Sequence, residues 1–275
     1  MRISSSIEVH SIRPSICGLL LGLGLLSRTA FYDHNHSRRF GQTSGAQRRL
    51  IVHCLGRAAE VRLVSEHLRE HYADLAPAPR LTVIEPEVAP DTSKRESIVA
   101  GYPDWVRAFW DEGTARVILG AWRPSFVGDR DLYGLVDAVA MAPRLAADHD
   151  GFRMLLTVAD PLDGQYVRDL QRAIDNSGLG LKVRILTGQY QMWPLVEQAE
   201  LLLRPTLTDG NSVSILEAQH LGTPVLASDC VQRPGGVATF PTGDAEAMAR
   251  AVDAVLRGAD GGPTTPDASA PDKLE

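Results

Sequence analysis

Residues 201–229 read LLLRPTLTDGNSVSILEAQHLGTPVLASD. The apolar run at 201–203 is typical of a buried strand in a parallel sheet, and residues 212–221 have the composition of a helix that ends at Gly222. A second apolar run at 225–227 predicts the next strand. Strand, polar turn, helix and strand in this order indicate an α/β fold, and similar alternation continues from residue 115 to residue 256.

Two carboxylates flank the polar turn before this helix. Asp209 precedes the turn Gly210-Asn211-Ser212, and Glu217 lies about a turn and a half into the helix. The first N–H groups of a helix lack partners within the helix and attract anions, so the turn suits a diphosphate. A carboxylate at 217 can accept hydrogen bonds from ribose hydroxyls, and one at 209 would face the sugar end of the ligand. The segment therefore predicts a nucleotide-sugar site at the carboxyl end of a parallel strand.

This stretch resembles the C-terminal domain of family 4 retaining glycosyltransferases of the GT-B fold. Those enzymes carry two acidic residues separated by seven, followed by a Gly-Pro-Val strand. The matching residues are Asp209, Glu217, Gly222, Pro224 and Val225. The sequence motif RPTxTDGxSVSIxEA…LGxPVxASD…RPxG is similar to that of a subgroup associated with bacterial surface polysaccharide synthesis. The resemblance covers most of residues 80–256.

The resemblance implies a fold of two Rossmann-like domains with parallel sheets. It also implies transfer of a sugar from a nucleotide diphosphate sugar to a hydroxyl acceptor, with retention of anomeric configuration and without a metal or a cofactor. Asp209 would be catalytic. Relatives often place a histidine near the reacting sugar, and between His34 and His36 we favour His36 as catalytic because His-Ser fits the family pattern.

Each donor-binding residue implied by the resemblance could instead have a purely structural role. Asp209 and Glu217 would otherwise be solvated carboxylates, the serines would be helix caps, and Arg204 would be a charged strand end. Asp229 fits a turn or a site equally well. The expected set is Gly210, Asn211, Ser212, Val213, Ser214, Glu217, Arg204 and Arg123.

The chain departs from the family pattern at three positions. Ala121 stands where relatives have a diphosphate-binding arginine, and Tyr133 stands where they have a lysine. Arg123 or Arg130 would then supply the charge. The first acidic residue, Asp209, is one methylene shorter than the usual glutamate.

Asp129-Arg130-Asp131 spells the DxD of a metal-dependent glycosyltransferase fold, but nothing around it matches that fold, so we expect no metal there.

The length of 275 residues suggests two domains. We expect a partial N-terminal, acceptor-side domain with its linker at 1–95, a nucleotide-sugar-binding domain at 96–257 and a disordered tail at 258–275. The N-terminal domain would lack its opening strands, so its sheet would expose an unpaired edge and an apolar face. A non-catalytic nucleotide-sugar-binding remnant is the alternative function. A sugar-nucleotide epimerase on the same fold is disfavoured by the paired acids.

Charge and cysteine content limit the partners and the compartment. The net charge of −6 argues against nucleic-acid binding, and three scattered cysteines favour a reducing compartment such as the cytoplasm. The apolar run at 16–26 is interpreted as a buried helix, with a signal peptide as the alternative. Six arginines and one acid lie between residues 38 and 62. These arginines form either a solvated helix face or a contact with anionic lipid headgroups. The resemblance implies a sugar or lipid-linked acceptor, and a lipid-linked acceptor would fit the second alternative.

Overall fold

The computed structural model describes residues 6–35, 37, 40, 43–84 and 88–259. The chain divides into two compact units, which are described separately below. The first unit holds residues 1–88 together with 208–213, and the second holds residues 89–207 and 214–275. Of the predicted tail at 258–275, residues 258 and 259 are the end of a helix (Ala245–Ala259), so the prediction is wrong there. Residues 260–275 and the catalytic candidate His36 lie outside the described residues.

The first unit is built on a parallel four-stranded sheet with the strand order β1-β2-β3-β4. Its strands are β1 (Ile7–Val9), β2 (Thr29–Asp33), β3 (Glu60–Leu63) and β4 (Leu81–Val83), its α-helices are α1 (Pro14–Gly22) and α2 (Gly45–Leu55), and its 3-10 helices are η1 (Leu26–Arg28) and η3 (Glu66–Tyr72). Ser65 precedes η3 and makes no side-chain cap bond to it.

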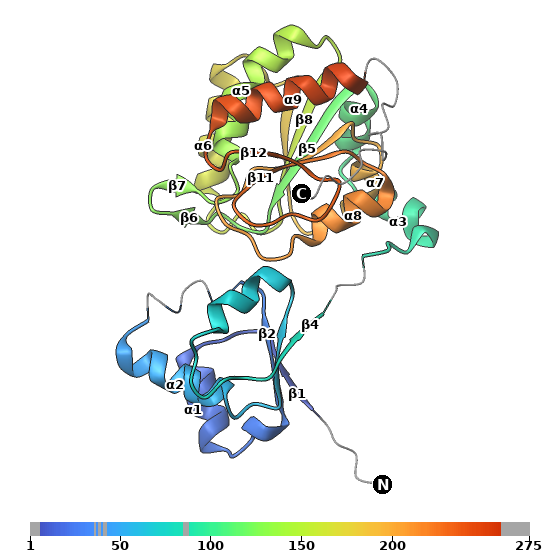
Figure 1. Ribbon diagram of the computed structural model, residues 1–275. Helices are drawn as coiled ribbons and strands as arrows, with labels where there is room; N and C mark the ends of the chain where they lie inside the picture. The colour runs from blue at the N-terminus through green and yellow to red at the C-terminus, as the bar shows by residue number, and fades with distance from the viewer. Residues whose placement is uncertain (1–5, 36, 38–39, 41–42, 85–87, 260–275) are drawn as a thin grey trace, which may run out of the picture. The chain divides into compact units, whose positions relative to one another are not determined.

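One face of this sheet packs against α1 and α2 and forms the core of the unit (Figure 1). Phe31, Val61 and Leu63 are fully buried there with Cys17 and Cys54 of the two helices. The strand alternation places polar side chains on the opposite face, which is partly exposed. These are Glu8, Tyr32, Glu60, Arg62 and Thr82, and hydrogen bonds and ion pairs link them across the strands.

The expectation of an exposed apolar sheet face is therefore wrong. Arg62 donates to Glu8 at 2.9 Å and to Glu60 at 2.6 Å, so the partly exposed face is a charged row that water can solvate. Residues 16–22 of the apolar run at 16–26 lie in α1, but the run leaves the helix after Gly22, and only one side of α1 is buried. Cys17 and Leu20 lie in the core, whereas Leu19 and Leu23 are 62% and 60% exposed.

The second unit is built on a parallel six-stranded sheet with the order β12-β11-β10-β5-β8-β9. Its strands are β5 (Ala115–Ala121), β8 (Phe152–Val158), β9 (Val183–Thr187), β10 (Leu201–Arg204), β11 (Val225–Ser228) and β12 (Ala238–Phe240), with a short hairpin of β6 (Phe126–Val127) and β7 (Arg130–Asp131). Its helices are α3 (Arg95–Ala100), α4 (Asp104–Asp111), α5 (Leu135–Asp148), α6 (Gln165–Asn176), α7 (Trp193–Val196), α8 (Val213–Leu221) and α9 (Ala245–Ala259), preceded by η4 (Thr92–Lys94).

Helices cover both faces of this sheet, as a parallel sheet requires (Figure 1). Helices α5, α6 and α9 enclose one apolar cluster, and α4, α7 and α8 enclose the other. Alternate residues of β5 supply the two cores, with Val117 and Leu119 on the first side and Ile118 on the second. This explains why the strand is apolar along nearly its whole length.

The strand order creates a switch point between β5 and β10. From β5 the chain proceeds outward to β8 and β9, and then returns to the other side of β5 to form β10, β11 and β12. In open parallel sheets, ligands bind outside the carboxyl ends of the strands at such a point. Here those ends are Ala121 of β5 and Arg204 of β10.

The approach of two connections at this switch point requires glycine at position 134. Gly134, which precedes α5, has φ of +68°, and a β-carbon there would lie 2.8 Å from the carbonyl oxygen of Pro205. Gly128 has a similar φ of +63°, but a β-carbon there would have no atom within 4 Å. Comparison of substitutions at Gly134 and Gly128 therefore distinguishes the cost of backbone strain from the cost of a steric clash.

We expect Gly134→Ala to lower the free energy of unfolding by about 2–4 kcal/mol, from left-handed strain plus overpacking. Gly128→Ala should cost only about 1–2 kcal/mol, since it carries the strain alone. Urea denaturation of both variants measures the difference. Equal losses would show that the contact between the two connections has no energetic weight.

Candidate functional site

The segment from β10 to α8 carries most of the predicted site. Residues 201–203 of β10 are buried, and the chain then passes through Pro205 and the buried Thr206 into the turn before α8. Asp209 and Ser212 are also buried, with 8% and 7% exposure. Asp209 Oδ1 accepts a hydrogen bond from the Gly210 N–H at 3.1 Å, so its carboxylate is held against the turn.

Close packing explains the glycine at position 210. The segment 208–213 belongs to the first unit, where Asn35 Nδ2 donates to Thr208 Oγ1 at 3.3 Å. A β-carbon on Gly210 would lie 3.3 Å from Asn35 Cβ and 3.4 Å from the His34 carbonyl oxygen. A larger residue would press on the loop that follows β2, so the polar turn needs glycine for its backbone to pass.

Arg204 stands at the carboxyl end of β10, beside the end of β5. Its Nη1 donates to the Gly120 carbonyl oxygen at 3.4 Å, and its guanidinium lies 5.5 Å from the ring centroid of Tyr133. Tyr133 occupies the position where the resembling family has a lysine, so here an aromatic ring supports an arginine. The structure thereby places one positive charge at the switch point of the sheet.

Glu217 lies on α8 and is half-buried. Burial raises the pKa of its carboxyl above the usual value. Tyr102 lies near it, since the Glu217 charge contributes to the raised pKa of Tyr102, for which burial is the larger cause. The Tyr102 hydroxyl itself donates to the Gln191 carbonyl oxygen at 2.6 Å. A half-buried carboxylate is the kind of group that accepts hydrogen bonds from sugar hydroxyls.

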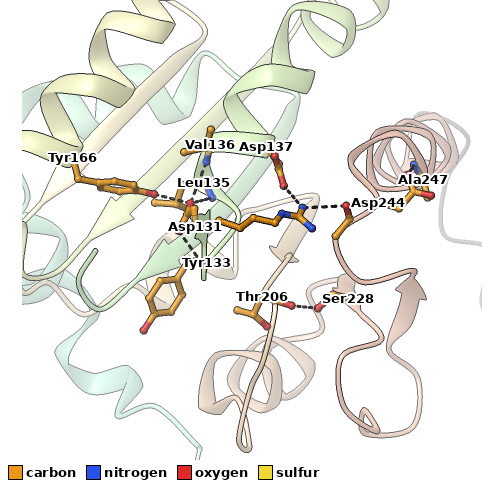
Figure 2. Close-up of polar contacts among 12 residues, drawn as sticks. Asp131, Tyr133, Leu135, Val136, Asp137, Tyr166, Thr206, Ser228, Asp244 and Ala247 are labelled. Atoms are coloured by element: carbon orange, nitrogen blue, oxygen red, sulfur yellow. Dashed lines mark hydrogen bonds and ion pairs between the residues drawn. The ribbon is translucent and has the colours of Figure 1, made fainter. Parts of the chain in front are cut away.

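Arg233 links the connection after β10 to the connection after β11. The sequence analysis did not name it as a site residue. Its guanidinium donates to the Ser228 carbonyl oxygen at 2.8 Å and reaches Thr206 Oγ1 at 3.3 Å. Ser228 Oγ in turn donates to the Thr206 carbonyl oxygen at 2.5 Å (Figure 2). The RPxG pattern was the only sequence signal for this residue, and its structural role is to fix the strand ends on either side of the turn.

Three charged candidates have partners within the protein. Arg123, expected to bind the donor, pairs with Asp160 at 2.7 Å, and Arg130 pairs with Asp137 at 3.4 Å. Asp229 accepts hydrogen bonds from the Thr242 N–H and hydroxyl at 2.7 and 2.6 Å, which hold its pKa below the usual value. The geometry around Asp229 favours the turn interpretation over the site interpretation.

The DxD tripeptide has a structural explanation in Asp131 (Figure 2). Its carboxylate accepts hydrogen bonds from the Leu135 and Val136 N–H groups at 2.6 and 3.2 Å, at the start of α5. It also accepts from the Tyr133 N–H at 3.0 Å and the Tyr166 hydroxyl at 2.7 Å. Burial and the Asp131 charge raise the pKa of Tyr166, so the phenol remains a donor. Within the described part of the chain, no group of three or more His, Cys, Asp or Glu residues is placed to hold a metal ion.

His34 follows β2 and faces His10, which follows β1. The His10 Nδ1 and His34 Nε2 atoms are 3.0 Å apart, and burial followed by the His10 charge lowers the pKa of His34. The histidines thus meet at the carboxyl edge of the first sheet. His36, the favoured catalytic candidate, is outside the described residues.

One family model matches part of the chain. Residues 126–258 match the family model of glycosyl transferases group 1. This range includes α8 and the whole predicted donor-binding segment from 204 to 217. No curated protein sequence matches the chain significantly.

Solved structures show the fold. HepE from Anabaena, in complex with UDP and glucose, is 14% identical with a TM-score of 0.63 over 92% of this chain. Sucrose-phosphate synthase from Thermosynechococcus elongatus is 17% identical with a TM-score of 0.64 over 92%, and trehalose 6-phosphate synthase from Burkholderia multivorans is 14% identical with a TM-score of 0.67 over 93%. The chain spans 72%, 65% and 64% of the lengths of these three proteins. The predicted GT-B-like α/β fold with parallel sheets is confirmed.

Proposed function

We propose that the protein is a retaining glycosyltransferase of the hexosyltransferase type, which moves a sugar from a nucleotide diphosphate sugar to a hydroxyl acceptor. One observation carries the proposal. Asp209 and Glu217 flank the start of α8 directly after β10, at the switch point where open parallel sheets bind ligands. The match of residues 126–258 to glycosyl transferases group 1 supports it.

The donor's diphosphate is assigned to the start of α8. The N–H groups of residues 211–214 lie where the helix begins, next to Gly210, whose own N–H donates to Asp209, and the first N–H groups of a helix favour a bound anion. Arg204 adds a positive charge near the end of β5. Arg123 is the weaker donor-binding candidate because Asp160 already neutralises it. These groups would stabilise the leaving diphosphate electrostatically as the glycosidic bond breaks.

The two carboxylates have separate roles in this proposal. Glu217 accepts hydrogen bonds from the ribose hydroxyls, and Asp209 fixes the donor sugar and is the catalytic carboxylate. His36 remains the proposed second catalytic residue. The proposal requires neither a metal nor a cofactor, and the donor is a substrate. HepE was solved with UDP and glucose, which fits a donor of this class.

The acceptor and the compartment are finer proposals. We assign a sugar or lipid-linked acceptor and a role in bacterial polysaccharide or glycolipid synthesis, on the resemblance of the RPTxTDGxSVSIxEA segment. The three free cysteines are compatible with a cytoplasmic protein. Among the described residues, no helix is long and apolar enough to cross a membrane.

The test is a transfer assay with the full chain, a panel of nucleotide diphosphate sugars and a panel of sugar and lipid-linked acceptors. We expect release of the nucleoside diphosphate that depends on the acceptor, and a product whose NMR spectrum shows the donor's anomeric configuration. Binding of the donor without any turnover would favour the non-catalytic remnant. A product with inverted configuration would contradict the retaining mechanism.

Protonation of Glu217 should weaken nucleotide binding. Its raised pKa means that the carboxylate is lost at a higher pH than for an ordinary glutamate, so affinity should fall as the pH is lowered from neutral. Calorimetric titration with UDP or GDP at about pH 5 and 7.5 measures this. Glu217→Gln should have low affinity at both pH values, and an equally steep pH dependence in that variant would exclude Glu217 as the cause.

A further inference from the structure

A cavity of about 530 Å³ opens on the first unit between α2 and residues 74–77, which lead toward β4. The α2 residues that line it are Gly45, Arg48, Arg49, Val52 and His53. Positions three and four apart lie on the same side of a helix, so these residues share one flank of α2. The volume of the cavity is within the ordinary range of small-molecule pockets.

The wall opposite α2 is anchored by its packing. Leu75 is buried in the core of the unit. At the end of α2, a β-carbon on Gly56 would lie only 2.8 Å from the Pro77 carbonyl oxygen, so the two segments approach each other closely there. The cavity therefore lies between two elements that are held in the same unit by close contacts.

The α2 side of the cavity is basic. Arg48 and Arg49 are exposed, and within the described residues no side chain pairs with either guanidinium; Arg49 Nε donates to the Gly45 carbonyl oxygen at 3.3 Å. The Arg57 guanidinium lies 2.6 Å from His53 Nδ1 and adds positive charge beside the cavity. Guanidinium groups with unused N–H donors bind carboxylate and phosphate oxygens through pairs of hydrogen bonds.

The opposite wall carries one acidic residue, Asp74, which is exposed. In the part of the chain that the structure describes, Asp74 forms no ion pair, although Arg48 and Arg49 line the same cavity. The opposite charges therefore border one space without meeting. A ligand with an anionic group at one end and hydroxyl groups at the other would contact both walls, because a carboxylate accepts hydrogen bonds from hydroxyls.

The position of the cavity separates it from the edge of the sheet that is expected to bind substrates. In open parallel sheets, ligands bind outside the carboxyl ends of the strands. In this unit His10 and His34 lie at that edge, and neither lines the cavity. The contact between Gly56 and Pro77 lies toward the amino ends of β3 and β4, since these two residues precede those strands.

We propose that this cavity binds a phosphate monoester of a polyhydroxy compound, such as a sugar phosphate. Arg48 and Arg49 bind the phosphate, and Asp74 accepts hydrogen bonds from the hydroxyl groups. A phosphate monoester carries nearly two negative charges at neutral pH, which matches two guanidinium groups better than a single carboxylate does. The proposal does not rest on the donor site, since no residue of α8 or of the turn before it lines the cavity.

Calorimetric titration of the full chain tests the proposal, with glucose 6-phosphate, inorganic phosphate and glucose as probes. We expect the affinity to be highest for glucose 6-phosphate, lower for inorganic phosphate and undetectable for glucose. Arg48→Gln with Arg49→Gln should weaken the binding of glucose 6-phosphate at least about tenfold. Arg48→Lys with Arg49→Lys should weaken it less, because the charge is kept while the paired hydrogen bonds are lost.

Asp74→Asn tests the recognition of the hydroxyl groups. The preference for glucose 6-phosphate over inorganic phosphate should fall about threefold or more, since only the sugar contacts Asp74. Arg69→Gln is the matched arginine control, because Arg69 is exposed in the same unit and pairs with Glu66 away from the cavity. It should bind all three probes like the unaltered protein. Circular dichroism confirms that each variant is folded.

Glu217→Gln separates this site from the donor site. It should bind glucose 6-phosphate like the unaltered protein, whereas the double glutamine variant of Arg48 and Arg49 should bind UDP or GDP normally. Loss of glucose 6-phosphate binding in Glu217→Gln would assign that binding to the donor site and overturn the proposal. No binding of glucose 6-phosphate, full binding by the double glutamine variant, or an unchanged preference in Asp74→Asn would also overturn it. Binding to phosphatidic acid vesicles without binding of glucose 6-phosphate would place the monoester on a lipid and would contradict it as well.

Discussion

Asp209→Asn should slow sugar transfer by about 100-fold or more while the affinity for the nucleoside diphosphate changes less than about threefold. Asparagine has nearly the same shape but no charge. Asp209 is buried and is held by the Gly210 N–H, so the substitution should leave the turn in place. A carboxylate that acts on the sugar end of the donor would therefore lose its catalytic effect without loss of the nucleotide contacts.

The measurement is the initial rate of transfer with the best donor and acceptor pair, together with a nucleotide titration. Asp229→Asn is the matched control, because Asp229 is exposed and engaged by Thr242. The control should transfer within about twofold of the unaltered protein. Equal rates for Asp209→Asn and the control would remove Asp209 from the catalytic assignment.

Asp131→Ala should lower the free energy of unfolding by about 2–4 kcal/mol. The substitution leaves three N–H groups around the start of α5 and the Tyr166 hydroxyl without their common acceptor. The first turn of α5 then loses its cap, and the partly buried phenol loses the charge that it donates to. Urea denaturation measures the effect.

Asp129→Ala is the control for this substitution, since Asp129 is exposed and belongs to the same tripeptide. It should change the stability by no more than about 0.5 kcal/mol. A metal site formed by both aspartates predicts a different result, in which the two substitutions have similar effects and a chelator reproduces them. That outcome would contradict the capping role of Asp131.

The sequence was most informative where local patterns decide the structure. The strands and helix of the 201–229 segment form β10, α8 and β11, and Gly222 has φ of +78° at the end of α8. Apolar runs bounded by polar turns predict such elements because each must be buried in a two-sided sheet. The burial of Asp209 and Ser212 could not be predicted from such local patterns, since it depends on the packing of other residues around the turn.

The helices before β5 were missed. The sequence analysis predicts a linker at the end of residues 1–95, whereas η4 begins at Thr92 and α3 at Arg95. Helix α4 has its buried residues Val106, Phe109 and Trp110 at helical spacing, a signal that could have located it.

The tripeptide 129–131 shows why long-range contacts limit prediction from the sequence. The role of Asp131 depends on Tyr166, which is 35 residues away on α6, and on the positive φ of Gly134. The position of Arg233 between Thr206 and Ser228 likewise depends on the pairing of β10 with β11. Short patterns can propose such residues, but the tertiary structure determines which partner they meet.

The most direct test of the donor site is a calorimetric titration of UDP and GDP into the full chain and its Glu217→Gln variant. We predict that the unaltered protein binds at least one of the two nucleotides and that the variant binds it about 10–100 times more weakly, as loss of hydrogen bonds to a charged group requires. Glu246→Gln, at an exposed position of α9, should bind like the unaltered protein. Equal affinity of Glu217→Gln and the unaltered protein, or no nucleotide binding by the unaltered protein, would contradict the assignment of a nucleotide-sugar site to α8.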